Sequence, residues 1–243
     1  MAAPLRAVTF DFWNTLCRAR PAVTLERRQA AWRDVAVERA IPVDGAVLDS
    51  VLDHVSARHH EGWMTGVQFT ADHALDEAGV LLREVLRPGD LDALRDAWMQ
   101  ASARADVSLT PHCESVLAGL RERGVRLGIV CDVGLTPSVL LRQYLAEHRI
   151  LEHFDHWSFS DEVGVYKPHP AIFEHALAGL GADPAEALHI GDIRRTDVAG
   201  AHAAGMRAVR YRGVADDEDA TLADAPVVLD DLRELLAVVD SLR

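Results

Sequence analysis

Hydrophobic residues follow two different spacings along the chain. Between Leu25 and Ala105 they recur every three or four positions, as on one face of an amphipathic helix. This spacing predicts four helices, over Leu25–Ala40, Val47–His60, Ala71–Leu86 and Leu91–Ala105. Proline or glycine interrupts the pattern between these helices, including at Gly62–Gly66, so we expect short turns and a small helical bundle.

Short hydrophobic runs alternate with helical segments in the rest of the chain. The first run lies in Val8–Leu16, and later strands are predicted over Val125–Val130, His156–Phe159, Ala187–Ile190, Ala208–Tyr211 and Val227–Leu229. Helices are predicted over Thr110–Gly124, Thr136–His148, Pro170–Leu180, Val198–Ala204 and Asp231–Leu242. In the first of these, Thr110 is the expected N-cap and Gly124 the expected left-handed C-terminal residue. The alternation predicts an α/β fold with a doubly wound parallel sheet covered by helices on both faces.

The two spacings also predict two domains. We expect an α/β core domain made of residues 1–16 and 108–243, and a helical domain of residues 17–107 inserted after the first strand. A chain of 243 residues is long enough to bury a large core in such an arrangement.

Composition and charge narrow the classes of partner. Hydrophobic content of 49% with 26% charged residues is typical of a globular enzyme or binding protein. A net charge of −13 argues against nucleic-acid partners, because phosphate backbones are bound by clustered lysine and arginine. A small anionic substrate stays compatible with this charge if local dipoles and a cation bind it.

Cysteine usage and the absence of long apolar runs suggest a location. Cys17, Cys113 and Cys131 are odd in number and lack metal-ligand spacing, so a disulfide framework is not expected. The first residues do not resemble a signal peptide, and no run of about 18 apolar residues occurs. These observations predict a cytoplasmic protein without membrane partners.

The first candidate for chemistry is Asp11, at the end of the first predicted strand. Ligands of open α/β sheets collect at the carboxyl ends of strands. A carboxylate placed there can act as a nucleophile or bind a hard cation. Thr15 follows within the same stretch, and its hydroxyl can hold a transferred group by a hydrogen bond.

Other chemically active residues follow later strands. Cys131 and Asp132 end one strand in a glycine-containing turn, Lys167 precedes a helix, and Asp192 and Asp197 lie across a strand-to-helix turn. If the aspartates converge with Asp11, their repulsion requires either a cation between them or raised pKa values. Mg²⁺ is the expected cation, because it accepts a few carboxylates and keeps water for a phosphate. The positive charge of Lys167 would offset the negative charge of an anionic substrate or of the nucleophilic carboxylate.

Simpler structural roles compete with these interpretations. Asp11 and Asp192 are also compatible with acids of turns, Asp197 with an N-cap, and Lys167 with a loop lysine exposed to solvent. Trp13 suits either a wall of the substrate site or packing against the inserted helices. We interpret His189 as a satisfied histidine within its strand, and Arg194 and Arg195 as surface or ion-pair residues.

Four ordered motifs resemble the haloacid dehalogenase superfamily of aspartate-nucleophile hydrolases, of the capped subfamily I type. They are Asp11 with Thr15, Lys167 in Tyr166–Pro170, the pair Asp192 and Asp197, and the continuation Asp197–Ala201. The resemblance implies a Rossmann-like core with the helical insertion as a cap. It also implies a phosphoaspartyl mechanism on Asp11, with Mg²⁺ held by Asp11, Asp192, Asp197 and the main-chain carbonyl of Trp13.

Two positions depart from that family's pattern. Trp13 stands where phosphatases of the family usually carry a second aspartate, and indole neither protonates a leaving oxygen nor activates water. Loss of a general acid/base typically costs about 10²- to 10⁴-fold in rate. Cys131 replaces the usual phosphate-binding hydroxyl and is followed by Asp132, leaving the backbone amides there to bind phosphate.

Three hypotheses follow. The first is a Mg²⁺-dependent phosphohydrolase acting on a small phosphorylated metabolite, as a monomer or a homodimer. In it Thr15, Trp13, Cys131 and Asp132 contact the substrate, and the activity is weak or restricted to good leaving groups. The second is a 2-haloacid dehalogenase-type hydrolase, which the acids at Asp192 and Asp197 disfavour. The third is a catalytically impaired, ligand-binding regulatory protein.

Overall fold

The computed structural model describes residues 3–104 and 106–243. Contacts between Cα atoms divide the chain into two compact units. The core unit contains the chain up to Arg18 together with Ser108–Asp132 and Arg142–Arg243, and the helical unit contains Ala19–Val107 and Val133–Leu141. The short segment Val133–Leu141 therefore groups with the helices rather than with the strand before it. The two domains expected from the sequence stay a prediction.

The core unit is built on a parallel sheet, and the predicted α/β fold is confirmed. Within the described residues the sheet has six strands in the order β5-β4-β1-β6-β7-β8. Their bounds are β1 Ala7–Phe10, β4 Arg126–Cys131, β5 His156–Phe159, β6 Ala187–Gly191, β7 Arg207–Tyr211 and β8 Val227–Leu229. After β1, the strands β4 and β5 are added on one side of it, and β6, β7 and β8 are then added on the other side. The strand order therefore reverses beside β1, and such a reversal is where α/β proteins bind ligands.

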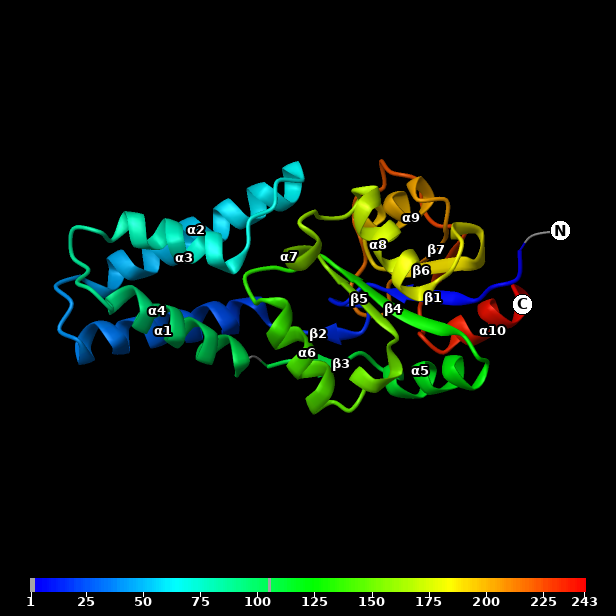
Figure 1. Ribbon diagram of the computed structural model, residues 1–243, viewed down its shortest axis with the longest axis horizontal. Helices are drawn as coiled ribbons and strands as arrows, with labels where there is room; N and C mark the ends of the chain where they lie inside the picture. Colours follow the sequence, from blue (N-terminus) through cyan, green and yellow to red (C-terminus); the bar gives the residue numbers. More distant parts are fainter. Residues whose placement is uncertain (1–2, 105) are drawn as a thin grey trace. The chain divides into compact units, whose positions relative to one another are not determined.

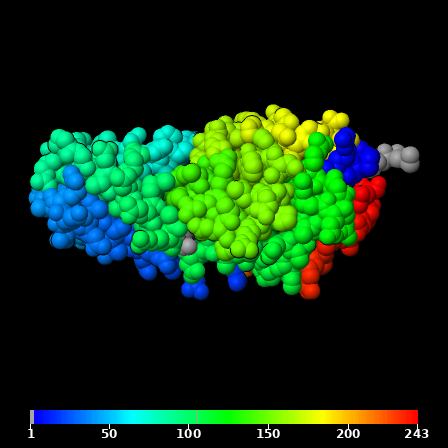
Figure 2. All heavy atoms as spheres, turned by 60° about the horizontal axis from the view of Figure 1, so that its bottom comes forward, coloured from blue at the N-terminus to red at the C-terminus, as the bar shows by residue number. Residues whose placement is uncertain are grey.

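Helices cover both faces of this sheet (Figure 1). The helices α8 (Pro170–Leu180) and α9 (Ala199–Ala203) lie on one face, and α5 (Cys113–Glu122) and α10 (Glu234–Ser241) lie on the other. Figure 2 shows α5 and α10, in green and red, at the surface of the core unit. All four residues of β1 are buried, because a parallel strand covered on both faces has no solvent side.

Shorter elements complete the core unit. They are the paired strands β2 (Cys17–Arg18) and β3 (Ser108–Leu109), the helices α6 (Ser138–Glu147, which begins in the helical unit) and α7 (Ser160–Val163), and the single turns η1 (Leu151–His153), η2 (Pro184–Glu186) and η3 (Arg194–Val198). The ribbon of β2 and β3 was not predicted, since two-residue strands are too short for a hydrophobic period to show.

One helix start differs from the prediction. Helix α5 begins at Cys113, after His112 in a left-handed conformation, and Thr110 is not its N-cap. The Thr110 hydroxyl instead donates to the main-chain oxygen of Thr15 at 2.7 Å. The expected left-handed Gly124 is confirmed, with φ of 70°. The Thr110 hydroxyl therefore forms a tertiary hydrogen bond instead of capping α5.

The helical unit contains α1 (Pro21–Glu38), α2 (Gly45–Thr65), α3 (Ala71–Leu81) and α4 (Asp90–Ala103). Helix α2 extends past His60, where its end was predicted, and stops within the predicted break Gly62–Gly66, at the left-handed Gly66. A Cβ at Gly62 would lie only 2.5 Å from the Val67 oxygen, so glycine is needed at that position. The helix expected to reach Ala105 is helical to Ala103, and Ala105 lies outside the described residues.

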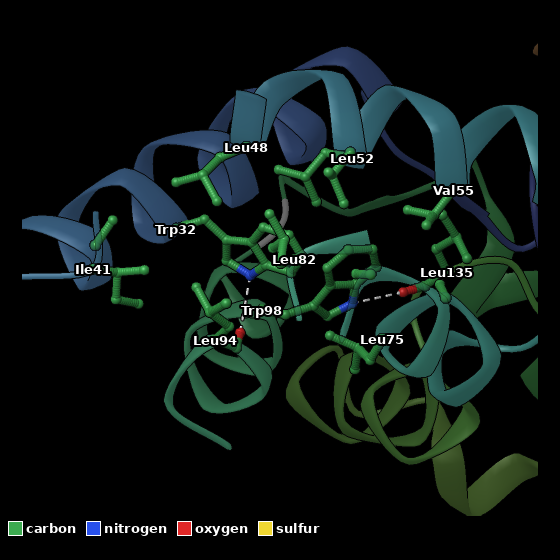
Figure 3. Close-up of a cluster of buried hydrophobic side chains, with 14 of the residues drawn as sticks. Trp32, Ile41, Leu48, Leu52, Val55, Leu75, Leu82, Leu94, Trp98 and Leu135 are labelled. Carbon is green, nitrogen blue, oxygen red and sulfur yellow. Dashed lines mark hydrogen bonds between the residues drawn. The ribbon is translucent and has the colours of Figure 1, made fainter. Parts of the chain in front are cut away.

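Two tryptophans fill the centre of the helical unit (Figure 3). Trp32 and Trp98 are buried with ring centroids 5.8 Å apart. Their indole nitrogens donate to main-chain oxygens, Trp32 to Leu94 at 2.9 Å and Trp98 to Leu135 at 3.1 Å. The second bond ties the segment after β4 to helix α4. None of the described helices has the length and apolar content to span a membrane.

Candidate active site

The predicted carboxylates lie at the carboxyl ends of adjacent strands. β1 pairs with β4 on one side and with β6 on the other. Asp11 directly follows β1, and its main-chain N–H extends the ladder by donating to Ile190 at 2.8 Å. Cys131 ends β4 and Asp192 follows β6. The parallel register therefore brings these residues, distant in sequence, to one edge of the sheet.

Lys167 connects the acidic residues at this edge. Its ammonium donates to Asp11 Oδ1 at 2.5 Å and to Asp197 Oδ1 at 2.7 Å, and its side chain is 2% exposed. The main-chain N–H of Lys167 donates to Asp132 Oδ1 at 2.7 Å. The structure thus brings three predicted carboxylates, Asp11, Asp132 and Asp197, into hydrogen bonds with Lys167, two with its buried ammonium and one with its main-chain N–H.

Asp197 accepts hydrogen bonds from several directions. Besides Lys167, it accepts from the main-chain N–H of Ile193 at 3.0 Å and from His189 Nε2 at 3.1 Å. Because a carboxylate only accepts, Nε2 carries the hydrogen, and Nδ1 accepts from the Thr9 hydroxyl at 2.9 Å. The interpretation of His189 as a satisfied strand histidine is confirmed. Asp197 is therefore held rigidly beside Lys167.

Burial and charge perturb the pKa values of Asp11, Lys167 and Asp197. Burial and the charges of Asp197 and Asp192 raise the pKa of Asp11, although Lys167 opposes this rise. Burial acts to raise the pKa of Asp197 as well, but Lys167 and His189 outweigh it and hold that pKa below its ordinary value. Burial tends to lower the pKa of Lys167, and Asp11 and Asp197 raise it instead. Asp197 therefore favours its ionised form beside the Lys167 ammonium.

Asp192 has a partner that sequence reasoning missed. Asn14 donates from its amide to Asp192 Oδ2 at 3.0 Å and adopts a left-handed conformation with φ of 59°. Burial, followed by the charge of Asp197, raises the pKa of Asp192 to about 7. The signal for Asn14 was present in the sequence, because asparagine tolerates the left-handed region better than most residues and lies in the turn after β1.

The remaining predicted site residues are Thr15 and Trp13, which follow Asp11 in sequence, and Cys131, at the end of the neighbouring strand. Thr15 is fully buried, and its hydroxyl forms no hydrogen bond with the described residues. The Cys131 thiol is buried close enough to Asp11 that burial and the Asp11 charge raise its pKa, so it is protonated. Trp13 is half-buried and packs edge-on against Phe12 at 4.7 Å between centroids. A buried hydroxyl without a partner is costly, and a ligand that accepts from Thr15 removes that cost.

The donor set fits a hard divalent cation. Asp11, Asp192 and Asp197 bring three carboxylates against the single ammonium of Lys167. No three acidic, histidine or cysteine side chains within residues 3–104 and 106–243 are already arranged around one cation position. Mg²⁺ typically uses only one or two carboxylates and completes its shell with water. Asp11 and Asp192, whose raised pKa values reflect negative charge that a cation would offset, match that requirement better than Asp197, which already accepts four hydrogen bonds.

Comparisons with known proteins agree with this geometry. A family model described as haloacid dehalogenase-like hydrolase matches residues 5–205. A glyceraldehyde 3-phosphate phosphatase from Pyrococcus abyssi is 35% identical over 215 residues, which cover 86% of this chain and 82% of that protein. Haloacid dehalogenase-like hydrolase domain-containing protein 3 from Mus musculus is 34% identical over 246 residues, covering 98% of this chain and 95% of that protein.

A solved structure shows the same fold over the whole chain. A 2-haloacid dehalogenase from Pseudomonas syringae superposes with a TM-score of 0.73 at 22% identity, covering 98% of this chain and 99% of that one. Family match, relatives and strand-end carboxylates all agree with the resemblance seen in the motifs. The chain belongs to the haloacid dehalogenase-like hydrolases.

Proposed function

We propose that this hydrolase is a phosphohydrolase that acts on a small phosphorylated metabolite through a phosphoaspartyl intermediate on Asp11. The observation that carries the proposal is the buried cluster in which Lys167 bridges Asp11 and Asp197 beside Asp192. The printed names of the Pyrococcus abyssi relative and of a phosphoserine phosphatase from Thermus thermophilus, 36% identical over 163 residues, support this class of reaction.

In the proposed reaction the Asp11 carboxylate attacks phosphorus, and the bond from phosphorus to the leaving oxygen breaks. Lys167 holds Asp11 in place and offsets negative charge on the transferred group, while Asp197 keeps Lys167 oriented and charged. Water then attacks the acyl phosphate, which releases inorganic phosphate and restores the carboxylate. The Thr15 hydroxyl gains its missing partner by donating to a phosphoryl oxygen.

Mg²⁺ is the cofactor that the donor set supports. We assign Asp11, Asp192 and the main-chain carbonyl of Trp13 as the groups that would hold it. When bound, Mg²⁺ stabilises charge on the phosphoryl oxygens and offsets the repulsion between carboxylates. The predicted ligand role of Asp197 stays a prediction, and the contacts of Asp197 support a second role as the partner of Lys167.

We propose that Trp13, Cys131 and Asp132 contact the substrate. Asp132 accepts from the Lys167 main chain, which joins the turn after β4 to the lysine. Trp13 lacks a titratable proton, so we propose that substrates with good leaving groups, such as acyl or aryl phosphates, react best. Cytoplasmic location and a monomer or homodimer stay predictions from the sequence.

The test is phosphate release from sugar, nucleotide, acyl and aryl phosphates, with Mg²⁺ or with a chelator. We expect Mg²⁺-dependent turnover in the wild type and a loss of at least roughly 10³-fold in Asp11→Asn, because the nucleophile is removed. Asp240→Asn, which removes only a surface ion pair with Arg123, serves as the matched control and should retain activity.

Three results would count against the proposal. Absence of turnover on every phosphate, under conditions where Mg²⁺ binds, removes the phosphohydrolase assignment. Chloride release from 2-haloacids without metal would support the dehalogenase alternative instead. Ligand binding without turnover in either assay would support a regulatory protein.

A further inference from the structure

Arg194 lies between Asp192 and Asp197 in the sequence, within the turn after β6. It forms hydrogen bonds with aspartates of the loop between β7 and β8. Its main-chain N–H donates to Asp217 Oδ2 at 2.7 Å. Its guanidinium donates to the main-chain oxygen of Asp217 and, at 2.9 Å, to Asp224 Oδ2. We call residues 216–224, between β7 and β8, the acidic segment.

A buried arginine of the sheet anchors the acidic segment. Arg210 on β7 is 1% exposed and donates to both oxygens of Asp224, at 2.7 and 2.9 Å. It also donates to Asp216. The Arg210 hydrogen bond outweighs partial burial and lowers the pKa of Asp224 to about 2, so this carboxylate is ionised at neutral pH. The chain of contacts therefore runs from β7 through Asp224 to Arg194.

This network differs from ordinary surface ion pairs. The side chains of Arg194 and Asp217 are 11% and 12% exposed, whereas those of the nearby pair Arg212 and Asp230 are 43% and 71% exposed. Exposed pairs contribute little, while a carboxylate that accepts from a main-chain N–H in a sheltered position forms a stronger, charge-assisted bond. Asp217 is thus able to fix the backbone between Asp192 and Asp197.

We propose that Asp217 is a positioning residue for the metal site, which holds the Arg194 backbone so that Asp192 is presented toward Asp11. The inference rests on the proposed function, since it takes Asp192 as a Mg²⁺ ligand. Partners that orient metal ligands from outside the coordination shell typically change metal affinity by about 10- to 100-fold when removed. The acidic segment acts on the site through Arg194 and touches neither substrate nor metal.

The test measures cation affinity of the metal-free protein directly, by Mg²⁺ titration calorimetry and by Mn²⁺ electron paramagnetic resonance. We expect Asp217→Ala to weaken Mg²⁺ binding roughly 10-fold. Asp217→Asn keeps an oxygen that accepts from the Arg194 N–H, so its affinity should stay within about threefold of the wild type. Asp230→Ala removes the exposed pair with Arg212 and is the matched control, expected within about twofold.

Asp224→Asn provides a second measurement if Asp217→Ala does not fold. It loosens the acidic segment from Arg210 and Arg194 while keeping its shape, and we expect affinity to fall by roughly threefold or more. Unchanged Mg²⁺ affinity in folded Asp217→Ala, or in Asp224→Asn where Asp217→Ala does not fold, would overturn the inference. Equal weakening in Asp230→Ala would also overturn it, because general loss of negative charge would then be the cause. Failure of the wild type to bind Mg²⁺ would instead remove the proposed function.

Discussion

Lys167 sets the electrostatics of the site at the scale of single residues. It is fully enclosed, and it pairs with Asp11 and Asp197 within 2.7 Å. Removing one partner of such a buried pair leaves an uncompensated charge, which is far more costly than loss of a surface pair. The nucleophile is therefore held by a cation that another carboxylate keeps charged.

Trp13 leads to a prediction on leaving groups. Trp13→Asp introduces a carboxyl group where the chain has an indole, and we expect faster hydrolysis of alkyl phosphates, whose leaving oxygen needs a proton. The gain should be roughly 10²- to 10⁴-fold, the range of general acid/base catalysis. Rates on aryl phosphates, whose leaving groups depart without a proton, should change little. The measurement is kcat/KM for an alkyl and an aryl phosphate.

Trp13→Ala is the matched control for that experiment. It removes the edge contact with Phe12 without adding a proton donor, so it should not accelerate alkyl phosphate hydrolysis. Equal acceleration in both variants would show that the indole only obstructs the site.

At the scale of elements, the turn after β6 determines the geometry of the acids. The five residues of η3 form a π-helical turn that carries Asp197 back against the end of β6. π-helical turns are rare and frequently lie at functional sites. Close packing of Asp197 on Gly191 is what allows that carboxylate to reach both Lys167 and His189.

Gly191→Ala tests this packing. A Cβ at Gly191 would lie 2.2 Å from Asp197 Cγ, so Asp197 must move and Lys167 must lose its orientation. A displacement of about 1 Å in a catalytic group costs on the order of 10²-fold, and we expect kcat to fall by that amount. The measurement is kcat on the best phosphate substrate, with circular dichroism to verify folding.

A glycine away from the site provides the control. A Cβ at Gly119 in α5 meets the end of the Leu236 side chain at 3.2 Å, which is able to shift. Gly119→Ala should leave kcat unchanged, because Gly119 lies away from the site residues. The variant should also fold, because alanine is more favourable than glycine inside a helix. Full activity in Gly191→Ala would contradict the role assigned to the packing of Asp197.

At the scale of the whole molecule, net charge and local charge act in opposite directions. The net charge of the chain is −13, which disfavours the approach of negatively charged phosphorylated molecules in general. Lys167 and the cation that the carboxylates are suited to hold supply positive charge locally. Substrate binding should therefore depend on the cation more than on the surface.

Global stability should also respond to alkaline pH through a buried thiol. Cys113 is 1% exposed, and burial raises its pKa to about 12, against about 8.5 when unfolded. The folded state therefore retains a proton that the unfolded state loses, so stability falls as pH rises above about 8.5 and continues to fall up to about 12. At about pH 10 this amounts to on the order of 2 kcal/mol.

Urea unfolding near neutral pH and at about pH 10 measures this effect. Cys113→Ala should lose on the order of 2 kcal/mol less than the wild type between the two pH values. Ser115→Ala, on the same helix, should keep the wild-type response. An identical pH-dependent loss in Cys113→Ala and wild type would show that the thiol does not contribute.

Much of the fold follows from local pattern. The strands β5 and β8 and helix α8 have the predicted bounds, because their hydrophobic runs end at clear glycine, proline or polar residues. The start of α5 could not be predicted, since a hydrogen bond from Thr110 to Thr15, 95 residues away in sequence, decides it. The end of α2 is a local feature: the helix continues through Gly62 and stops at the left-handed Gly66, inside the predicted break.

The sequence by itself determined the class of fold, the family and the list of chemically active residues, because spacing of hydrophobic residues and ordered motifs are properties of the linear chain. Only the tertiary structure decided how those residues divide their roles. Lys167 turns out to bond both Asp11 and Asp197, Asn14 to support Asp192, and the acidic segment to hold Arg194. The reason is physical: hydrogen bonds and pKa values depend on distance and burial, and neither is encoded in sequence separation.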